Sequence, residues 1–426
     1  MIMICCEMKV CVLFFARKEC PYGAECGTKK TFIFNKCTIM NFCIICDDFP
    51  SKGRPTFVFV EQLVNELAKQ GEGITVIAPQ SLTRHFLRHV PLLPYSVVIE
   101  NNGYPYRVVR PYSFTLGNCP QWLHKILEKI RYKGIRCAIK EFCPHPDFIY
   151  GHFWHSAFVA RQYAYMHKIP LVVACGEGDN AIEQLASSVS REAKERFAKS
   201  VETVICVSSE NKRRSISHGL TTNEKVVVLP NSVDASIFQK TQNRTVRKEL
   251  GVADDDFLIA FTGAFIHRKG SARLSKAVDL LADNHIKIMF IGGKLEGDDA
   301  TPTCNGIVFQ GRLDHSVVPR YLCAADCFCL PTLNEGCSNA IVEALACGLP
   351  IVSSNLPFNE DILDETNSIL IDPMNVEEIA VALKRIKDNK QFRNRLSEGA
   401  IAKAAELRID IRAKKILEFI KRKIKK

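Results

Sequence analysis

Two glutamates separated by seven residues, Glu335 and Glu343, are the residues of this chain best suited by type and spacing to chemistry. Glu335 ends a predicted loop after an apolar strand, and a helix is expected to begin near Asn339. A helix N-terminus that follows a parallel strand can bind an anion. An ionised carboxylate only accepts hydrogen bonds, so it suits pairs of sugar hydroxyls. Three small residues behind Glu335 permit a close approach of the backbone to a ligand: Gly336, Cys337 and Ser338.

A basic pair, Arg268 and Lys269, lies in the segment FTGAFIHRKGS, in the loop after another predicted strand. Guanidinium and ammonium groups there would stabilise an anion, most strongly where negative charge develops during a reaction. A solvated basic loop is the alternative for this pair. Taken alone, Glu343 is likewise more typical of a solvated helix face, so the prediction depends on the combination.

The first half of the chain supplies three further candidates. His152 stands at the end of a predicted strand in PDFIYGHFWHSAF and is the candidate catalytic histidine. Glu177, in VACGEGD, is a candidate contact to acceptor or donor, and Gly53, in DDFPSKGRPTF, is a candidate close-approach glycine. Ligands of open α/β sheets bind at the carboxyl ends of the strands. Residues 254–256, three consecutive aspartates, precede a strand, so no metal site is predicted there.

The elements that must position these residues alternate regularly from Met40 onward. Repeated strand–helix units with short connections predict two doubly wound domains, each with a parallel sheet covered on both faces. The expected parts are an irregular extension over residues 1–39, a first domain over 40–228, a second over 229–405 and a basic helix over 406–426. The predicted strands are NFCIIC, ITVIAP, YRVVR, DFIYG, PLVVAC, TVICVS, FLIAFT, IKIMFIGG, GIVFQG, DCFCLP, PIVSS and SILID. The predicted helices cover 56–70, 121–142, 155–167, 191–199, 271–283 and 376–387, with one more through Tyr321 and one from Asn339.

The composition limits the class of protein to which this chain can belong. With 47% hydrophobic and 24% charged residues the chain is of globular type, and its apolar runs are shorter than the roughly 20 residues that span a bilayer. Most of the cysteines after residue 46 lie in apolar runs, and the pair Cys43 and Cys46 is predicted to be buried rather than redox-active. The net charge of +11 fits nucleic acid, an anionic membrane or anionic substrates without choosing among them.

The paired glutamates around a glycine loop, in the second half of a double α/β chain, resemble the signature of retaining GT-B glycosyltransferases, especially glycosyltransferase family 4. VSS at 207–209, LPNSVD at 229–234 and GRLDHSVVPRYL extend the resemblance. It implies two facing Rossmann-like domains, with the C-terminal helix crossing back to the first. It also implies that Glu335 engages the transferred sugar, Glu343 the ribose, and Arg268 with Lys269 the phosphates, while His152 approaches the reacting sugar. The family's usual arginine after the first glycine is Ala264 here.

The activity implied is transfer of a sugar from a UDP- or GDP-linked donor, with retention, to a saccharide or lipid-linked acceptor of bacterial surface polysaccharide synthesis. No obligatory metal or other cofactor and no nucleic-acid partner are expected. The expected location is cytoplasmic, at the inner face of the membrane. Two alternatives stay open: a GT-B nucleotide-sugar isomerase, and a non-catalytic nucleotide-sugar-binding protein.

Two basic, apolar segments, residues 121–142 and the C-terminal run AKKILEFIKRKIKK, raise the question of membrane contact. Basic amphipathic helices lie on anionic lipid, each lysine or arginine contributing about 1 kcal/mol. The alternative for the C-terminal segment is that its apolar face packs across the first domain, with its lysines merely solvated.

Overall fold

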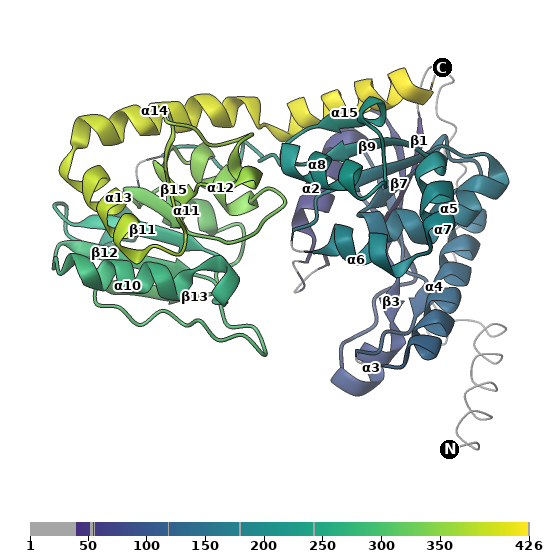
Figure 1. Cartoon of the computed structure of the whole chain (residues 1–426), viewed down its shortest axis with the longest axis horizontal. Coiled ribbons are helices and arrows are strands. Elements are labelled where there is room, and N and C mark those ends of the chain that lie inside the picture. Colours follow the sequence, from purple (N-terminus) through teal and green to yellow (C-terminus); the bar gives the residue numbers. More distant parts are fainter. Residues whose placement is uncertain are drawn as a thin grey trace. The chain divides into compact units, whose positions relative to one another are not determined.

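The computed structural model describes residues 40–51, 54, 56–117, 119–178, 180–241 and 243–424, which build two α/β domains (Figure 1). Residues 1–39, predicted to be an irregular extension, and Gly53 lie outside the described residues. Each domain has its own parallel sheet, and the polypeptide crosses between them near residue 230 and again at the start of the last helix. The prediction of two doubly wound domains is confirmed.

The first domain contains an eight-stranded sheet in the order β10-β9-β8-β7-β1-β2-β5-β4. All neighbours are parallel except β4, which pairs antiparallel with β5 at the edge. The prediction missed this hairpin, although Asn102 and Gly103, both at positive φ, form the kind of turn that reverses a chain. The strands are β1 (Asn41–Cys46), β2 (Gly73–Ile77), β4 (Ser96–Ile99), β5 (Tyr106–Val109), β7 (Phe148–His152), β8 (Leu171–Cys175), β9 (Val201–Cys206) and β10 (Val226–Val228).

Strand β1 lies in the middle of this sheet, and its residues from Phe42 to Cys46 are fully buried. Because side chains alternate along a strand, Cys43 and Cys46 point to opposite faces, each into a different apolar cluster. They therefore cannot pair with each other, and burial raises the pKa of the Cys46 thiol. The prediction of buried packing for these cysteines is confirmed.

Helices cover both faces of the first sheet. One face packs against α2 (Val58–Lys69), and the other against α4 (Gln121–Phe142), α5 (Trp154–His167) and α7 (Arg191–Ser200). In α2, Val60, Leu63, Val64 and Leu67 carry the helical spacing and are buried. Only the second half of α4 packs in this way, through Ile135, Ala138 and Ile139.

The second domain has a six-stranded, all-parallel sheet in the order β13-β12-β11-β14-β15-β16. Its strands are β11 (Phe257–Thr262), β12 (Ile286–Ile291), β13 (Ile307–Gly311), β14 (Cys327–Leu330), β15 (Ile351–Ser354) and β16 (Ser368–Ile371). Its helices are α10 (Ser271–Leu281), α11 (Val318–Leu322), α12 (Asn339–Ala346), α13 (Val376–Asp388) and α14 (Lys390–Glu406). Since β11 and β14 are neighbours, the loops after them meet at one edge of the sheet.

The last helix, α15 (Ile409–Ile424), leaves the second domain and lies along the first, as Figure 1 shows in yellow. Ile416, Leu417, Phe419 and Ile420 are buried in the cluster that also contains the apolar face of α2. Lys421 pairs with the buried carboxylate of Glu72 at 2.7 Å. The crossing helix is confirmed, and the idea that its apolar face lies on lipid is wrong, because the first domain already covers that face.

Several shorter elements were not predicted. Helix α8 (Ser209–Ser217) is polar, without an apolar period, and Ser208 caps it by accepting a hydrogen bond from the backbone nitrogen of Asn211 at 3.2 Å. In addition, Asp361 of the second domain accepts hydrogen bonds from the backbone nitrogen and hydroxyl of Ser209, both at 2.6 Å. This carboxylate caps a helix of the first domain and so joins the two domains. The other unpredicted elements are the edge strand β10, the long helix α14, β3 (Gln80–Ser81), α3 (Leu82–Arg88), β6 (Tyr112–Ser113), α6 (Ala181–Ser188), α9 (Arg244–Glu249), η1 (Asn223–Lys225), η2 (His267–Lys269) and η3 (Pro357–Asn359).

Candidate active site

The two predicted halves of a donor site, the basic pair and the first glutamate, meet at the carboxyl ends of β11 and β14. The side chain of Glu335 is 11% exposed, and its Oε1 accepts hydrogen bonds from Lys269 Nζ at 2.5 Å and from Thr332 Oγ1 at 2.9 Å. Arg268 Nη1 lies 3.6 Å from the same oxygen and donates to the carbonyl of Asn334 at 2.7 Å. All of these contacts of Glu335 within the described part of the chain use the same oxygen, beside two cations.

Gly270 explains how the basic loop turns back toward β14. Its φ of +79° lies in the left-handed region, and a Cβ there would stand 2.4 Å from the carbonyl oxygen of Pro331. Only glycine fits both conditions without strain. The residue therefore fixes the loop so that Arg268 and Lys269 face the loop that carries Glu335.

Glu343 lies on α12, one turn inside the helix, and its carboxylate is paired. His315 Nε2 lies 2.9 Å from Glu343 Oε1, and this hydrogen bond raises the pKa of His315 above its usual value. The pairing was not predicted, although His315 belongs to the segment GRLDHSVVP that carried part of the family resemblance. A sequence pattern alone does not show that the loop after β13 reaches α12.

The first domain supplies the facing wall, where His152 ends β7. The imidazole is 6% exposed, and burial, helped by the nearby Arg412 guanidinium, lowers its pKa to about 3. Its Nδ1 has no hydrogen-bond partner among the described residues. The rings of Phe59 and Phe153 lie 5.5 and 4.7 Å from it, centroid to centroid. His152 is therefore a neutral, pre-positioned group rather than a cation.

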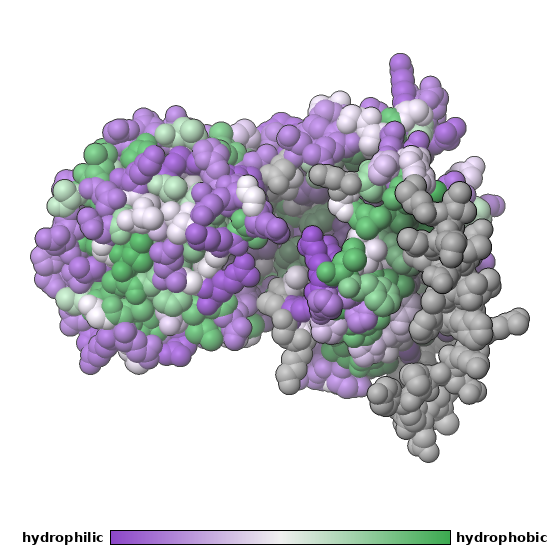
Figure 2. All heavy atoms as spheres, turned by 90° about the horizontal axis from the view of Figure 1, so that it is seen from below, coloured by the Kyte–Doolittle hydropathy of each residue, from purple (hydrophilic) through white to green (hydrophobic). Residues whose placement is uncertain are grey.

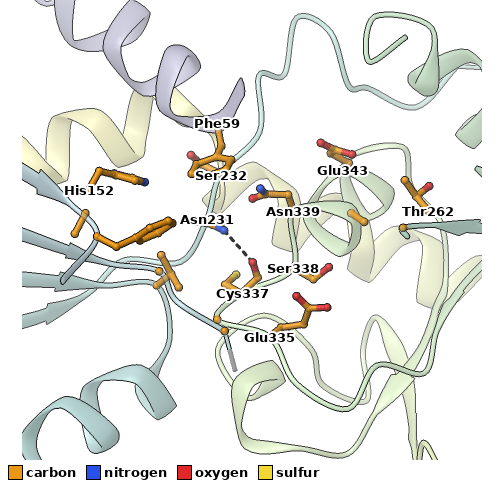
Figure 3. A pocket seen from close by; sticks show the side chains of 18 of the residues that line it. Phe59, His152, Asn231, Ser232, Thr262, Glu335, Cys337, Ser338, Asn339 and Glu343 are labelled. Atoms are coloured by element: carbon orange, nitrogen blue, oxygen red, sulfur yellow. Dashed lines mark hydrogen bonds between the residues drawn. The ribbon is translucent and has the colours of Figure 1, made fainter. Parts of the chain in front are cut away.

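These walls enclose a cavity of about 440 Å³. Figure 3 shows His152 and Phe59 on one side of it and Glu335, Ser338 and Glu343 on the other. An adjoining cavity of about 430 Å³ shares Glu343 and Asn339 and continues past His315. Figure 2 shows a hollow between the two domains, viewed from below. The predicted site residues that line the first cavity are His152, Arg268, Lys269, Glu335, Gly336, Cys337, Ser338, Asn339 and Glu343.

The small residues that follow Glu335 were predicted only to let a ligand approach the backbone. In the structure Gly336 and Cys337 also make contacts within the protein. A Cβ on Gly336 would lie 2.4 Å from the carbonyl oxygen of Gly176, so this glycine allows contact between the two domains as well as lining the cavity. Burial raises the pKa of Cys337 to about 12, which keeps its thiol neutral. The backbone carbonyl of Cys337 accepts a hydrogen bond from Asn231 Nδ2 at 2.9 Å, drawn dashed in Figure 3.

Glu177 lies behind the cavity wall and not among the residues that line it. Its Oε1 accepts a hydrogen bond from the backbone nitrogen of Trp154 at 2.6 Å, at the start of α5. Burial raises the pKa of this carboxyl to about 7. The described arrangement makes Glu177 a cap for α5, while Gly176 and Gly178 beside it do line the cavity.

The aspartates at 254–256 are far from this chemistry in the fold. Asp255 and Asp256 lie near His285, with its Nδ1 3.3 Å from Asp256 Oδ1, and these three form the one group with metal-like spacing among the described residues. They precede β11 and β12, whereas the cavity lies after these strands. The cavity and this group of two aspartates and a histidine therefore lie at opposite edges of the second sheet.

Comparison with known proteins decides the family. The profile of the glycosyl transferases group 1 matches residues 242–403, and that of glycosyltransferase family 4 matches residues 57–237. The chain belongs to glycosyltransferase family 4. It is a retaining-family glycosyltransferase with a GT-B fold that uses a nucleotide sugar.

Individual relatives are distant. The chain is 27% identical over 375 residues to TuaC of Bacillus subtilis, a glycosyltransferase assigned to teichuronic acid biosynthesis, covering 84% of this chain and 92% of that protein. It is also 27% identical to an Escherichia coli galactosyltransferase that acts on GlcNAc-diphosphoundecaprenol, covering 63% of this chain and 70% of the other. The structure of HepE from Anabaena in complex with UDP-glucose has a TM-score of 0.68 and 17% identity, covering 90% of this chain and all of HepE.

Proposed function

We propose that this glycosyltransferase moves a sugar from a UDP- or GDP-linked donor, with retention of anomeric configuration, to a saccharide or lipid-linked acceptor of bacterial surface polysaccharide synthesis. The observation that carries the proposal is the meeting of Arg268, Lys269 and Glu335 at one edge of the second sheet, opposite His152. The names of two relatives support the acceptor class, since one acts on an undecaprenol-linked sugar and the other is assigned to teichuronic acid.

Arg268 and Lys269 would hold the diphosphate, and the charge that develops as it leaves would strengthen both contacts in the transition state. Glu335 already orients Lys269 through a 2.5 Å contact, and its second oxygen would accept from hydroxyls of the transferred sugar. Glu343 would accept from the ribose hydroxyls, with His315 fixing the carboxylate. His152, which is neutral and lines the cavity, would approach the reacting sugar.

The test is release of nucleotide from UDP- and GDP-sugars, with and without a lipid-linked acceptor, in the wild type, Glu335→Gln and Glu343→Gln. Both variants are isosteric and remove only a charge, so we expect an unchanged fold and a loss of turnover on the order of 100-fold. Glu398→Gln, a change at an exposed carboxylate of the same domain, is the matched control. Wild-type turnover in both site variants would contradict the donor-site assignment.

The product separates the remaining activities. NMR of the glycoside formed would show the anomeric configuration, and conversion of the nucleotide sugar without an acceptor would indicate an isomerase. Tight binding of nucleotide sugar with neither reaction would indicate a binding protein. Transfer that needs added divalent metal would contradict the expectation that basic side chains alone neutralise the diphosphate.

The proposed location is the cytoplasmic face of the membrane, and the surface that would make contact is formed by α3 and the first half of α4. No described helix is long and apolar enough to cross a bilayer. In α4 the exposed Trp122, Ile126 and Ile130 recur every four residues and so form one stripe. A second stripe of Lys125, Lys129 and Lys133 runs beside it, and α3 adds exposed Phe86, Leu87, Arg84 and Arg88.

Apolar side chains beside lysines suit an anionic lipid surface, because the rings and chains insert while the ammonium groups meet phosphates. We expect the protein to sediment with vesicles containing anionic lipid, less so at raised salt. Trp122→Ser should weaken this binding. Tyr165→Ser, at a ring of 79% exposure on α5, is the control that should not. Absence of sedimentation at low salt would refute the contact.

A further inference from the structure

The cavity has a third cation, Arg412, which no pattern in the sequence singled out. It lies on the crossing helix α15, is 8% exposed and lines the 440 Å³ cavity together with His152 and Cys337. The C-terminal helix therefore contributes a charged side chain to a site otherwise built from strand-end loops.

This guanidinium is poorly satisfied. Among the described residues it donates one hydrogen bond, from Nε to the carbonyl of Leu229 at 3.4 Å, and makes no ion pair. Arg273 shows what a structural arginine looks like in this chain at the same 8% exposure: it donates to the carbonyls of Pro373, His267 and Pro331 at 2.7, 2.8 and 2.8 Å. A guanidinium has five N–H donors, so Arg412 keeps most of its capacity for a ligand.

Among the described residues, the groups that act on Arg412 offer no negative charge. His152 is neutral, and burial raises the pKa values of Tyr150 and Cys337 to about 12, so both are protonated near neutral pH. The two carboxylates that line the cavity are engaged, Glu335 with Lys269 and Glu343 with His315. A buried charge without a partner is costly, which favours completion of the pair by a ligand.

We propose that Arg412 binds the carboxylate of a uronic acid, carried by the transferred sugar or by the acceptor sugar. This proposal rests on the proposed function and narrows its substrate class. A guanidinium pairs with a carboxylate through two parallel hydrogen bonds. One unpaired cation matches one monoanion, whereas the donor diphosphate has its own pair of cations in Arg268 and Lys269. The carboxylate would therefore lie on the first-domain side of the cavity, near His152.

The test compares matched substrates that differ only in oxidation at one carbon. The donor arm uses UDP-glucuronate against UDP-glucose, UDP-galacturonate against UDP-galactose, and GDP-mannuronate against GDP-mannose. The acceptor arm uses a neutral donor with uronate-terminated or neutral oligosaccharides. We expect the wild type to prefer the carboxylate substrate in one arm by on the order of 100-fold in kcat/KM, since a site built for a charged group discriminates strongly against its absence.

Arg412→Met, which keeps the length and packing of the side chain, should reduce that preference to about one. Arg412→Lys should keep part of it, and Lys414→Met, an exposed change on the same helix, should keep all of it. Because both kcat/KM values are measured on the same protein sample, their ratio does not depend on how much of a variant is folded. Equal use of both substrates by the wild type would overturn the proposed role of Arg412, and so would an unchanged ratio of kcat/KM values in Arg412→Met. Neither result would bear on the proposed function. A wild type that gives no thermal shift with UDP or GDP would overturn the proposed function as well.

Discussion

Replacing Glu177 by glutamine is expected to stabilise the protein above neutral pH and to leave its stability near pH 4 unchanged. The carboxyl is 9% exposed and accepts a hydrogen bond from the first backbone nitrogen of α5. A helix N-terminus favours a negative charge there by roughly 0.3–1 kcal/mol. Burial opposes the charge more strongly, because the pKa is raised to about 7 from the ordinary 4.5.

The sign of the effect follows from linkage. A group whose folded pKa is raised gives a stability that is complete below its unfolded pKa and is lost as pH rises through the folded value. The difference between 4.5 and about 7 corresponds to about 3 kcal/mol. Glutamine keeps the acceptor for the α5 nitrogen and has no charge to bury. The variant should therefore gain under about 1 kcal/mol relative to wild type at pH 5 and about 3 kcal/mol at pH 8.

Urea unfolding of both proteins from pH 5 to 8 gives this difference directly, since other titrating groups contribute equally to both. Glu398→Gln, the same substitution at an exposed carboxylate, is the control. A Glu177→Gln difference that does not grow with pH, or a variant that is less stable at pH 8, would refute the reasoning. The second result would mean that the carboxylate is ionised and acts as a charged cap.

Three further predictions concern the His315 pair, the last helix and the first 39 residues. Glu343→Gln should lower the pKa of His315, observed by NMR titration of the ring, and an unmoved pKa would show that the pair does not persist in solution. Ile420→Ala should lower the free energy of unfolding by about 2–5 kcal/mol, because Ile420 is fully buried, whereas a negligible loss would mean that α15 detaches easily. A chain shortened to begin at Met40 should keep the melting temperature and activity of the full chain, and loss of folding would show that residues 1–39 are integral.

Much of the fold could be predicted because its strands are central and parallel. Runs such as residues 42–46 and 257–261 are buried on both faces, so they are apolar and easily recognised. Helix α8 was not predicted, because its sequence SENKRRSIS has no apolar face; Ser208 caps it locally, and Asp361 adds a contact from the second domain. The contact spans 152 positions, and only the folded chain brings these residues together.

The candidate site divides in the same way. Glu335, Lys269 and His152 follow strands, and strand ends of a parallel sheet converge, so their presence in one cavity could be predicted. His315 and Arg412 could not, since the first depends on the path of a loop to α12 and the second on the docking of α15 across the first domain. Glu177 also follows a strand, yet its side chain caps α5 and does not line the cavity. A position at a strand end places a residue at the edge of the sheet but does not determine where its side chain points.

The charges of the cavity also bear on how a donor would enter it. Lys269 and Arg268 both contact Glu335, so these cations are already positioned for a diphosphate. A buried pair of this kind contributes little net stability to the fold, but it keeps the ammonium group oriented in a site shielded from water. If the diphosphate takes over Lys269, Glu335 loses one of its donors and becomes a stronger acceptor for the sugar hydroxyls. Binding of the leaving group and binding of the transferred sugar would then be coupled through a single carboxylate, which is why Glu335→Gln should impair turnover more than it impairs the binding of free nucleotide.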